Sequence, residues 1–388
     1  MNICFVQISQ WGGSVEFALQ ELSKRLCERG FNVHILTNPE KRSQLGRYYR
    51  TLNLSNVSVH TVPFGNAPLR NWRVLTTLLQ INRVTKLDVV QIFGAGSLLP
   101  LLLFKHLTRT PLVYSEWTPH HWFGAPPSFA QMTYNKALIE CSDKIVAMTD
   151  TQKRAIIKNL HVPESRVSVI PHGIDLKEFS CRDRFNLKAR VRKFHNISQN
   201  DPVLLFVGRL DAYKGVEDAI EALSELLETY PNARLLLVGP PSSCDMQKLR
   251  GYIAAKKMVN NVFFVGMVKR NELIAYYYAS DLFIFPSRLE GFGIVLAEAM
   301  AASLPVIVYD LAPINSVVGD DAGILVQPGN SKALASAARM LIQDHTLYER
   351  CAQAGRRKAE RLYNIDRVTD NYVALYMDLV YHREPRYL

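Results

Sequence analysis

The sequence lacks a long apolar run, a cysteine cluster and a low-complexity tract. Its longest apolar stretch, residues 98–104, is much shorter than the roughly 20 residues that a membrane-spanning helix needs. The six cysteines form no Cys-x-x-Cys pair and no tight spacing. This distribution is typical of a reducing compartment and argues against a structural zinc site. Residues 1–6 predict a strand instead of the basic start of a signal peptide. We therefore expect a soluble, cytoplasmic protein.

Two motifs of nucleotide and nucleic-acid binders are also missing. No Gly-x-Gly-x-x-Gly fingerprint follows the first predicted strand, so the sequence does not support a nicotinamide cofactor. No RNA- or DNA-binding motif accompanies the net charge of +11, and we expect no nucleic-acid partner. The charge then indicates either a solvated basic surface or an anionic partner, which would be an acidic membrane leaflet or a polyphosphate substrate. Basic residues gather in residues 41–50, 182–193 and 356–358.

The pattern along the chain predicts two α/β domains. With 388 residues the chain exceeds the size at which one core keeps growing. Short β-branched runs alternate with amphipathic helical stretches, as in parallel βαβ units. We predict two Rossmann-like, doubly wound domains that face a central cleft. The predicted parts are an acceptor-binding domain over residues 1–180, a connector over 181–200, a donor domain over 201–365, and a terminal helix within 366–388 that packs back on the first domain.

The most informative segment holds two carboxylates, Glu290 and Glu298, on either side of Gly291-Phe292-Gly293. Residues 282–285 predict a buried strand and residues 294–302 a helix. Glu290 thus lies between the end of a parallel strand and a helix N-terminus, where open α/β sheets bind ligands and free amides can donate hydrogen bonds to phosphate. Glu298 can share that side only if the helix begins near Gly293. Because carboxylates repel phosphate, we expect them to accept hydrogen bonds from the hydroxyls of a sugar and a ribose.

A second segment carries the cations. A predicted strand ends at Gly208, Arg209 stands at its carboxyl edge, and Lys214 comes just before the next predicted helix. A guanidinium fork and a compact ammonium suit a diphosphate leaving group, whereas the alternative is that both residues are ordinary surface cations. Near the start of the chain, Gly12 and Gly13 follow the first predicted strand. They would let a ligand approach the backbone, unless they form a plain tight turn.

Together these segments resemble the retaining glycosyltransferases of family 4, which have the two-domain GT-B fold. The resemblance spans nearly the whole chain. The matching segments are Gly12-Gly13, Ile170-Pro-His-Gly-Ile-Asp175, Val207-Gly-Arg-Leu210 with Lys214-Gly215, Phe285-Pro-Ser-Arg-Leu-Glu290-Gly-Phe-Gly293 with Glu298, and Ala322-Gly-Ile-Leu-Val326.

The resemblance implies a role for each site residue. Arg209 and Lys214 would bind the donor diphosphate and stabilise the charge that develops on it. Glu290 would hold the transferred sugar and Glu298 the ribose. The remaining donor-binding residues that it implies are Gly12, Gly13, Gly208, Gly291, Phe292, Gly293 and Ile294. The leaving phosphate would help to deprotonate the acceptor, so no base is assigned. The absence of Asp-x-Asp agrees with catalysis that needs neither a metal nor a cofactor beyond the nucleotide-diphosphate sugar.

The sequence departs from the family in two places that bear on the site. A histidine is usual at the end of the strand predicted over residues 112–115, but this chain has Ser115-Glu-Trp-Thr-Pro-His120 there. His120 is our candidate for a sugar or acceptor contact, and a plain loop histidine is the alternative. His172 stands where asparagine is common. The aromatic residues of 117–129 could stack on a sugar, enter a membrane interface or form a packed lid.

We therefore predict a retaining hexosyltransferase that moves a sugar from a nucleotide diphosphate to a hydroxyl on a glycan or a lipid-linked acceptor. The basic segments would dock it peripherally on the anionic inner face of a membrane. The alternatives are a nucleotide-sugar epimerase with the same fold, a non-catalytic nucleotide-sugar-binding protein and, last, a nucleic-acid binder. The donor base, the sugar and the acceptor stay open.

Overall fold

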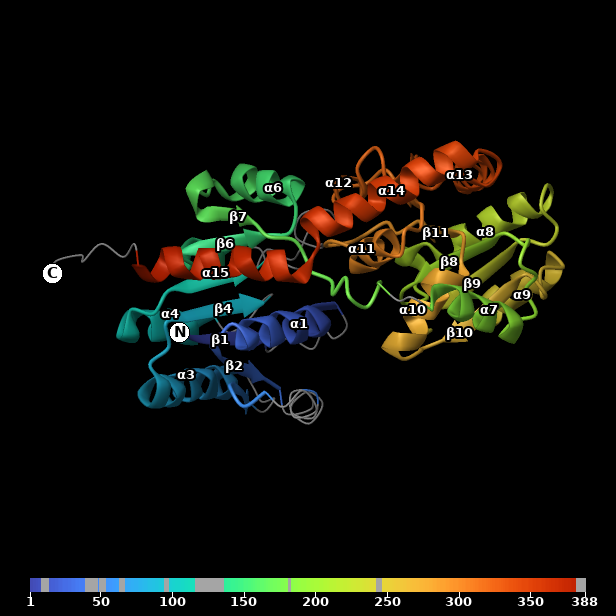
Figure 1. The fold of residues 1–388 in the computed structure, drawn as a ribbon. Helices are drawn as coiled ribbons and strands as arrows, with labels where there is room; N and C mark the ends of the chain where they lie inside the picture. Colours follow the sequence, from blue (N-terminus) through green and yellow to red (C-terminus); the bar gives the residue numbers. More distant parts are fainter. Residues whose placement is uncertain are drawn as a thin grey trace. The chain divides into compact units, whose positions relative to one another are not determined.

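The computed structural model describes residues 1–7, 14–38, 48, 54–62, 67–93, 98–115, 136–180, 183–241 and 246–381. The chain divides into two compact units. The first comprises Met1–Gly173 together with Ile365–Leu388, and the second comprises Ile174–Asn364. Each unit is built on one parallel sheet covered by helices (Figure 1). The predicted architecture of two doubly wound α/β units is confirmed.

The first unit has a seven-stranded sheet with the order β3-β2-β1-β4-β5-β6-β7. Its strands are β1 (Asn2–Gln7), β2 (Asn32–Thr37), β3 (Val57–Thr61), β4 (Val89–Phe93), β5 (Leu112–Ser115), β6 (Lys144–Ala147) and β7 (Val167–Val169). The helices are α1 (Ser14–Glu28), α3 (Ala67–Thr85), α4 (Leu98–Thr108), α6 (Asp150–Leu160) and α15 (Ile365–Tyr381). Most strands are buried on both faces, which explains why they read as nearly continuous apolar runs.

The helices of this unit cover both faces of the sheet. One face shares a core with α3, α4 and α6, to which β4 contributes Val90 and Ile92. Successive strand residues point to opposite faces, so Gln91 points away from this core. There the Tyr376 hydroxyl of α15 donates a hydrogen bond to Gln91 Oε1, and Gln91 Nε2 donates to Ser115 Oγ at 2.6 Å. The terminal helix α15 therefore packs on the face opposite α3 and α4, where it also contacts α1.

The second unit has a six-stranded sheet with the order β10-β9-β8-β11-β12-β13. Its strands are β8 (Val203–Val207), β9 (Arg234–Val238), β10 (Val262–Gly266), β11 (Leu282–Phe285), β12 (Val306–Tyr309) and β13 (Gly323–Val326). The helices are α7 (Arg184–Phe194), α8 (Val216–Leu227), α9 (Met246–Ala255), α10 (Arg270–Ala279), α11 (Ile294–Ala301), α12 (Ile314–Val318), α13 (Ser331–Gln343) and α14 (His345–Leu362). The strand order reverses between β8 and β11, and ligands bind outside the carboxyl ends of strands at such a point.

The stretch expected to be a connector, residues 181–200, contributes α7 to the second unit. This helix packs against α10, and its Arg192 is only 1% exposed. Arg192 donates hydrogen bonds to the carbonyl oxygens of Ala279 and Asp201 and forms an ion pair with Asp281. The chain instead passes between the units after Gly173 and returns after Asn364. The polar composition of residues 181–200 suggested a linker. Composition alone does not distinguish a solvated charge from a buried charge, such as that of Arg192, that binds backbone carbonyl groups.

No helix within the described ranges combines the length and the apolar character needed to cross a bilayer.

Two buried histidines make the stability of the chain depend on pH. Burial lowers the pKa of His172 from 6.5 to about 3 and that of His34 in β2 to about 4. Between those values and 6.5 the unfolded chain binds protons that the folded chain does not. The free energy of unfolding therefore falls as the pH drops below about 6.5.

We predict that His172→Asn weakens this pH dependence. Removing one such histidine should reduce the slope of the unfolding free energy by up to about 1.4 kcal/mol per pH unit below pH ~6. Calorimetric melting temperatures at a series of pH values from neutral to mildly acidic give the measurement. His106→Asn, a change at an exposed residue of α4, is the control and should keep the wild-type slope. An unchanged slope in His172→Asn would contradict the assignment.

Candidate functional site

The candidate site lies in the segments that follow β8 and β11, the two neighbouring strands at which the sheet order reverses. A close backbone contact joins the two segments. Gly215 has φ +75°, and a side chain at this position would place its Cβ 2.0 Å from the carbonyl oxygen of Pro286. The Arg288 amide also donates a hydrogen bond to the Tyr213 carbonyl at 2.8 Å. The segment after β8 is therefore fixed against the segment after β11.

This contact brings a predicted phosphate-binding cation beside a predicted sugar-binding carboxylate. Lys214 Nζ forms an ion pair with Glu290 Oε1, and the two side chains are 17% and 11% exposed. The ammonium also lies over the rings of Tyr213 and Phe285, at 5.4 and 5.7 Å from their centroids. An ammonium has three donors and a carboxylate has two oxygens, so each partner keeps hydrogen-bonding capacity for a further group.

Arg209 joins the same cluster through Tyr213. Its guanidinium carbon lies 5.5 Å from the Tyr213 ring centroid, and its Nε lies 3.4 Å from Asp211 Oδ2. The Arg209 side chain is 45% exposed, whereas that of Asp211 is 2% exposed. The buried carboxylate thus orients a cation whose outer part stays accessible. Asp211 and Tyr213 were not among the predicted site residues, although both stand within the same Gly-Arg-Leu-Asp-Ala-Tyr-Lys segment.

Glu298 lies in the helix that follows this site. Gly293 caps α11 with φ +79°, and the helix begins at Ile294, so Glu298 is little more than one turn from the start. Glu298 is 3% exposed and both of its oxygens have partners from α10. Arg270 Nη1 forms an ion pair with Oε1, and the Tyr277 hydroxyl donates to Oε2 at 2.8 Å.

Arg270 holds a second carboxylate at the same time. Its Nε and Nη2 lie 2.9 and 2.7 Å from Glu178 Oε2. Burial would lower the pKa of Arg270, but the charges and hydrogen bonds of Glu298 and Glu178 outweigh burial and raise it. Burial and then the charge of Glu298 raise the pKa of Tyr277 well above 10, so its hydroxyl keeps its proton and donates. Sequence reasoning missed Arg270, Tyr277 and Glu178 because no local motif links them to Glu298.

Some of the other predicted site residues lie within the described part of the chain, and the rest lie outside it. Phe292 buries its side chain edge-on against the Tyr363 ring, with centroids 5.3 Å apart, so only its backbone could reach a ligand. Gly208, Gly291, Gly293 and Ile294 lie in the two loops or at the start of α11. Gly12, Gly13, His120 and the aromatic residues of 117–129 lie outside the described residues.

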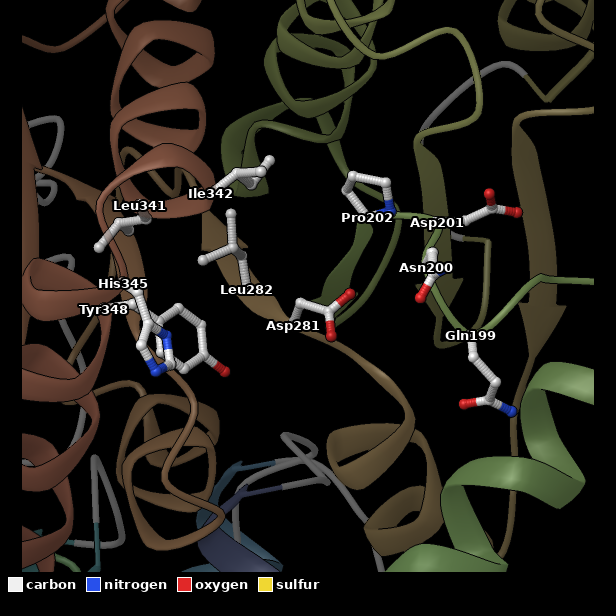
Figure 2. Close-up of a pocket in the computed structure, with 10 residues that line it drawn as sticks. All are labelled: Gln199, Asn200, Asp201, Pro202, Asp281, Leu282, Leu341, Ile342, His345 and Tyr348. Carbon is white, nitrogen blue, oxygen red and sulfur yellow. The ribbon is translucent and has the colours of Figure 1, made fainter.

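A pocket of about 230 Å³ lies elsewhere in the second unit (Figure 2). In Figure 2, Leu341, Ile342 and Leu282 lie on one side of it, and the segment from Gln199 to Pro202 lies on the other. This pocket adjoins the residues that precede β8 and β11, at the amino ends of those strands. Open α/β sheets bind ligands at the opposite edge, so we assign the site to the loops after β8 and β11. In the described part of the chain, no group of three or more His, Cys, Asp or Glu side chains could hold a metal ion.

Two protein-family models match the chain. Residues 11–178 match the model "Glycosyltransferase Family 4", and residues 188–358 match the model "Glycosyl transferases group 1". An uncharacterized glycosyltransferase of Methanocaldococcus jannaschii is 26% identical over 378 residues, which cover 94% of each chain. The N-acetyl-alpha-D-glucosaminyl L-malate synthase of Bacillus anthracis is 24% identical over 372 residues, covering 93% of this chain and 92% of that protein.

Solved structures share the fold. The Anabaena protein HepE in complex with UDP and glucose is similar with a TM-score of 0.79 and 21% identity. The alignment covers 97% of this chain and 99% of HepE. A glycosyltransferase from Rickettsia africae gives a TM-score of 0.83 at 20% identity and covers 98% of this chain and 99% of its own.

We predict that Arg270→Leu destabilises the second unit by about 3–5 kcal/mol, because it leaves the buried Glu298 carboxylate without its cation. Chemical denaturation monitored by fluorescence and circular dichroism gives the measurement. The double variant Arg270→Leu/Glu298→Leu should recover most of the loss, since the one carboxylate then left without Arg270, that of Glu178, is 31% exposed and can be hydrated. Arg357→Leu, at an exposed position of α14, serves as the control and should change stability by less than about 0.5 kcal/mol. Wild-type stability in Arg270→Leu would refute this account of the network.

Proposed function

Because this chain belongs to the family 4 glycosyltransferases with the GT-B fold, we propose that it transfers a hexose from a nucleotide-diphosphate sugar to a hydroxyl acceptor with retention of anomeric configuration. The observation that carries the proposal is the convergence of Arg209, Lys214 and Glu290 at the point where the sheet order reverses. This is the arrangement that a negatively charged leaving group attached to a hydroxyl-rich sugar requires.

The two cations provide the electrostatic part of the reaction. Arg209 and Lys214 both lie against the Tyr213 ring, so their positive charges act on one region. In the proposed reaction the bond between the anomeric carbon and the diphosphate oxygen breaks, and negative charge grows on the diphosphate. Hydrogen-bond donors that are already held in position lower the barrier, because they stabilise the charge that develops in the transition state without having to reorient. We therefore assign leaving-group stabilisation to these two residues, without a metal ion or a cofactor other than the sugar nucleotide.

The carboxylates are assigned to hydroxyl groups. Glu290 would accept hydrogen bonds from the transferred sugar, and its contact with Lys214 would hold that sugar beside the diphosphate. Glu298 would accept hydrogen bonds from the ribose. Each carboxylate oxygen has two lone pairs, so the bonds from Arg270 and Tyr277 leave acceptor capacity on Glu298. Arg270 and Tyr277 would then act as positioning residues for the ribose-binding group.

The acceptor step needs no base from this chain. The acceptor oxygen attacks the anomeric carbon on the face from which the diphosphate departs, and its proton passes to an oxygen of the leaving phosphate. The products are the glycosylated acceptor and the nucleoside diphosphate. We propose that the acceptor is a glycan or a lipid-linked hydroxyl compound, and that the enzyme acts in the cytoplasm while associated peripherally with a membrane.

A nucleotide-sugar epimerase and a non-catalytic nucleotide-sugar-binding protein are the rival functions. An epimerase would convert the donor without any acceptor, and a binding protein would neither hydrolyse nor transfer the sugar. Thermal-shift screening of UDP-, GDP- and ADP-sugars identifies the donor, because a ligand that binds the folded state raises the melting temperature. UDP-glucose is the first probe, since HepE has been solved with UDP and glucose. Donor turnover with and without added acceptor, and NMR of the product's anomeric proton, then separate the three functions.

We predict that Arg209→Ala and Lys214→Ala each lower kcat about a hundredfold or more, because each removes charge that acts in the transition state. Turnover should also be the same in EDTA as in added Mg²⁺. Release of nucleoside diphosphate at saturating donor is the measurement. Lys248→Ala, at an exposed residue of α9 whose side chain is 75% exposed, is the control and should keep wild-type turnover. Full activity in either site variant, or loss of activity in EDTA, would overturn the assignment.

A further inference from the structure

Five large apolar side chains are exposed on two neighbouring helices of the first unit. In α3 these are Trp72 and Val84, which are 65% and 83% exposed. In α4 they are Leu99, Leu103 and Leu107, which are 58%, 39% and 62% exposed. Both helices cover the same face of the sheet and contact each other (Figure 1). We call the outward-facing residues of these two helices the α3–α4 face.

The leucines form one continuous stripe. A spacing of four residues places Leu99, Leu103 and Leu107 on one side of α4. Lys105 lies about 160° around the helix from Leu107. Lys105 pairs with Asp143, which precedes β6, at 2.8 Å and donates to the Cys141 carbonyl. The leucine stripe therefore faces away from the β6 side of the helix and toward the side on which α3 lies.

The tryptophan lies level with this stripe. Helices that connect parallel strands over one face of a sheet run in the same direction. Trp72 is in the second turn of α3, and Leu103 is in the second turn of α4. Both side chains thus lie near the edge of the sheet at which its strands end. Trp72, Leu99 and Leu103 are therefore exposed apolar side chains near that edge.

The same stretch of sequence is strongly basic. Between residues 67 and 110 the only acidic residue is Asp88, which accepts a hydrogen bond from the Asn2 amide at 2.7 Å. The basic residues of this stretch are Arg70, Arg73, Arg83, Lys86, Lys105 and Arg109. Arg73, Arg83 and Lys86 are exposed on or just after α3. The α3–α4 face is therefore both apolar and positively charged.

We propose that the α3–α4 face docks on a bilayer surface that contains anionic lipids. Tryptophan and leucine side chains enter the boundary between headgroups and acyl chains, while arginine and lysine pair with lipid phosphates and carboxylates. A second copy of the chain is a poorer occupant, because a symmetric contact between two such faces would bring their basic residues together. The inference rests on the proposed function only in that a lipid-linked acceptor would lie in the same bilayer.

This surface replaces two of the basic segments as the basis for docking. In residues 182–193, Arg192 is buried. In residues 356–358, Arg356 donates to the carbonyls of Phe179 and Ala301, and Lys358 donates to that of Ser316. These cations stabilise the second unit internally. Residues 182–193 also expose Phe185, at 79%, but the α3–α4 face presents five exposed large apolar side chains on two neighbouring helices together with exposed charge.

Co-sedimentation with phosphatidylcholine vesicles, with and without phosphatidylserine, tests the proposal. Wild-type protein should bind the vesicles that contain phosphatidylserine and should lose affinity as salt increases. Leu103→Glu/Leu107→Glu should weaken binding by about tenfold or more per leucine. Arg73→Gln/Arg83→Gln should weaken it about fivefold per charge and flatten the salt dependence. Val259→Glu, which changes an apolar residue of the second unit that is 63% exposed, is the matched control and should bind as wild type.

Tryptophan fluorescence gives a second readout that does not depend on the charge-introducing variants. Wild-type emission should shift to shorter wavelength on adding phosphatidylserine vesicles, and Trp72→Phe should remove most of that shift. Three results would each overturn the proposal. The first is that the wild-type protein does not bind the vesicles. The second is that the leucine variant binds them as tightly as the wild-type protein does. The third is that light scattering shows a dimer for the wild-type protein and a monomer for the leucine variant. The proposed donor site lies in the second unit, so a rise in melting temperature with UDP-glucose tests the proposed function independently of vesicle binding.

Discussion

The contact between Gly215 and the carbonyl oxygen of Pro286 is the constraint on which the candidate site depends. A Cβ at residue 215 would lie 2.0 Å from that oxygen, so any side chain would push the segments after β8 and β11 apart. Their separation is what sets the contact of Lys214 with Glu290 and the position of Tyr213, whose ring both cations contact. The chemistry proposed for the site thus follows from a backbone packing requirement at the point where the strand order reverses.

Exposure separates the cations that can act on a ligand from those that hold the fold together. Arg192 is 1% exposed, donates to four carbonyl oxygens and forms an ion pair with Asp281, so it is not available for a substrate. Arg209 is 45% exposed and is oriented from beneath by the buried Asp211. Arg270 lies between these cases, because it forms ion pairs with Glu298 and Glu178 inside the unit. Arginine side chains therefore have three different physical roles in this unit, and the net charge of the sequence cannot distinguish these roles.

The sequence predicts the parts of this fold that depend on local pattern. Parallel strands buried on both faces read as apolar runs, and Gly293 correctly marks the start of α11. The sequence does not reveal that Tyr277 and Arg270 hold Glu298, because these residues lie more than 20 positions before it and meet it only after α10 and α11 have packed. It also misassigned α7 to a connector, since polar residues on the exposed side of a helix resemble those of a linker.

The distribution of charge between the two units has a consequence for where the chain can meet a partner. In the second unit many basic residues form ion pairs with carboxylates, so their fields are largely cancelled nearby. Residues 67–110 of the first unit have six Lys or Arg residues and one acidic residue, and of the six cations Lys105 pairs with Asp143, which lies outside this stretch. An uncancelled field acts over about one Debye length, roughly 8 Å at physiological salt. Long-range attraction to an anionic surface would thus orient the α3–α4 face toward it before the exposed leucines make contact, and apolar burial would then prolong the encounter.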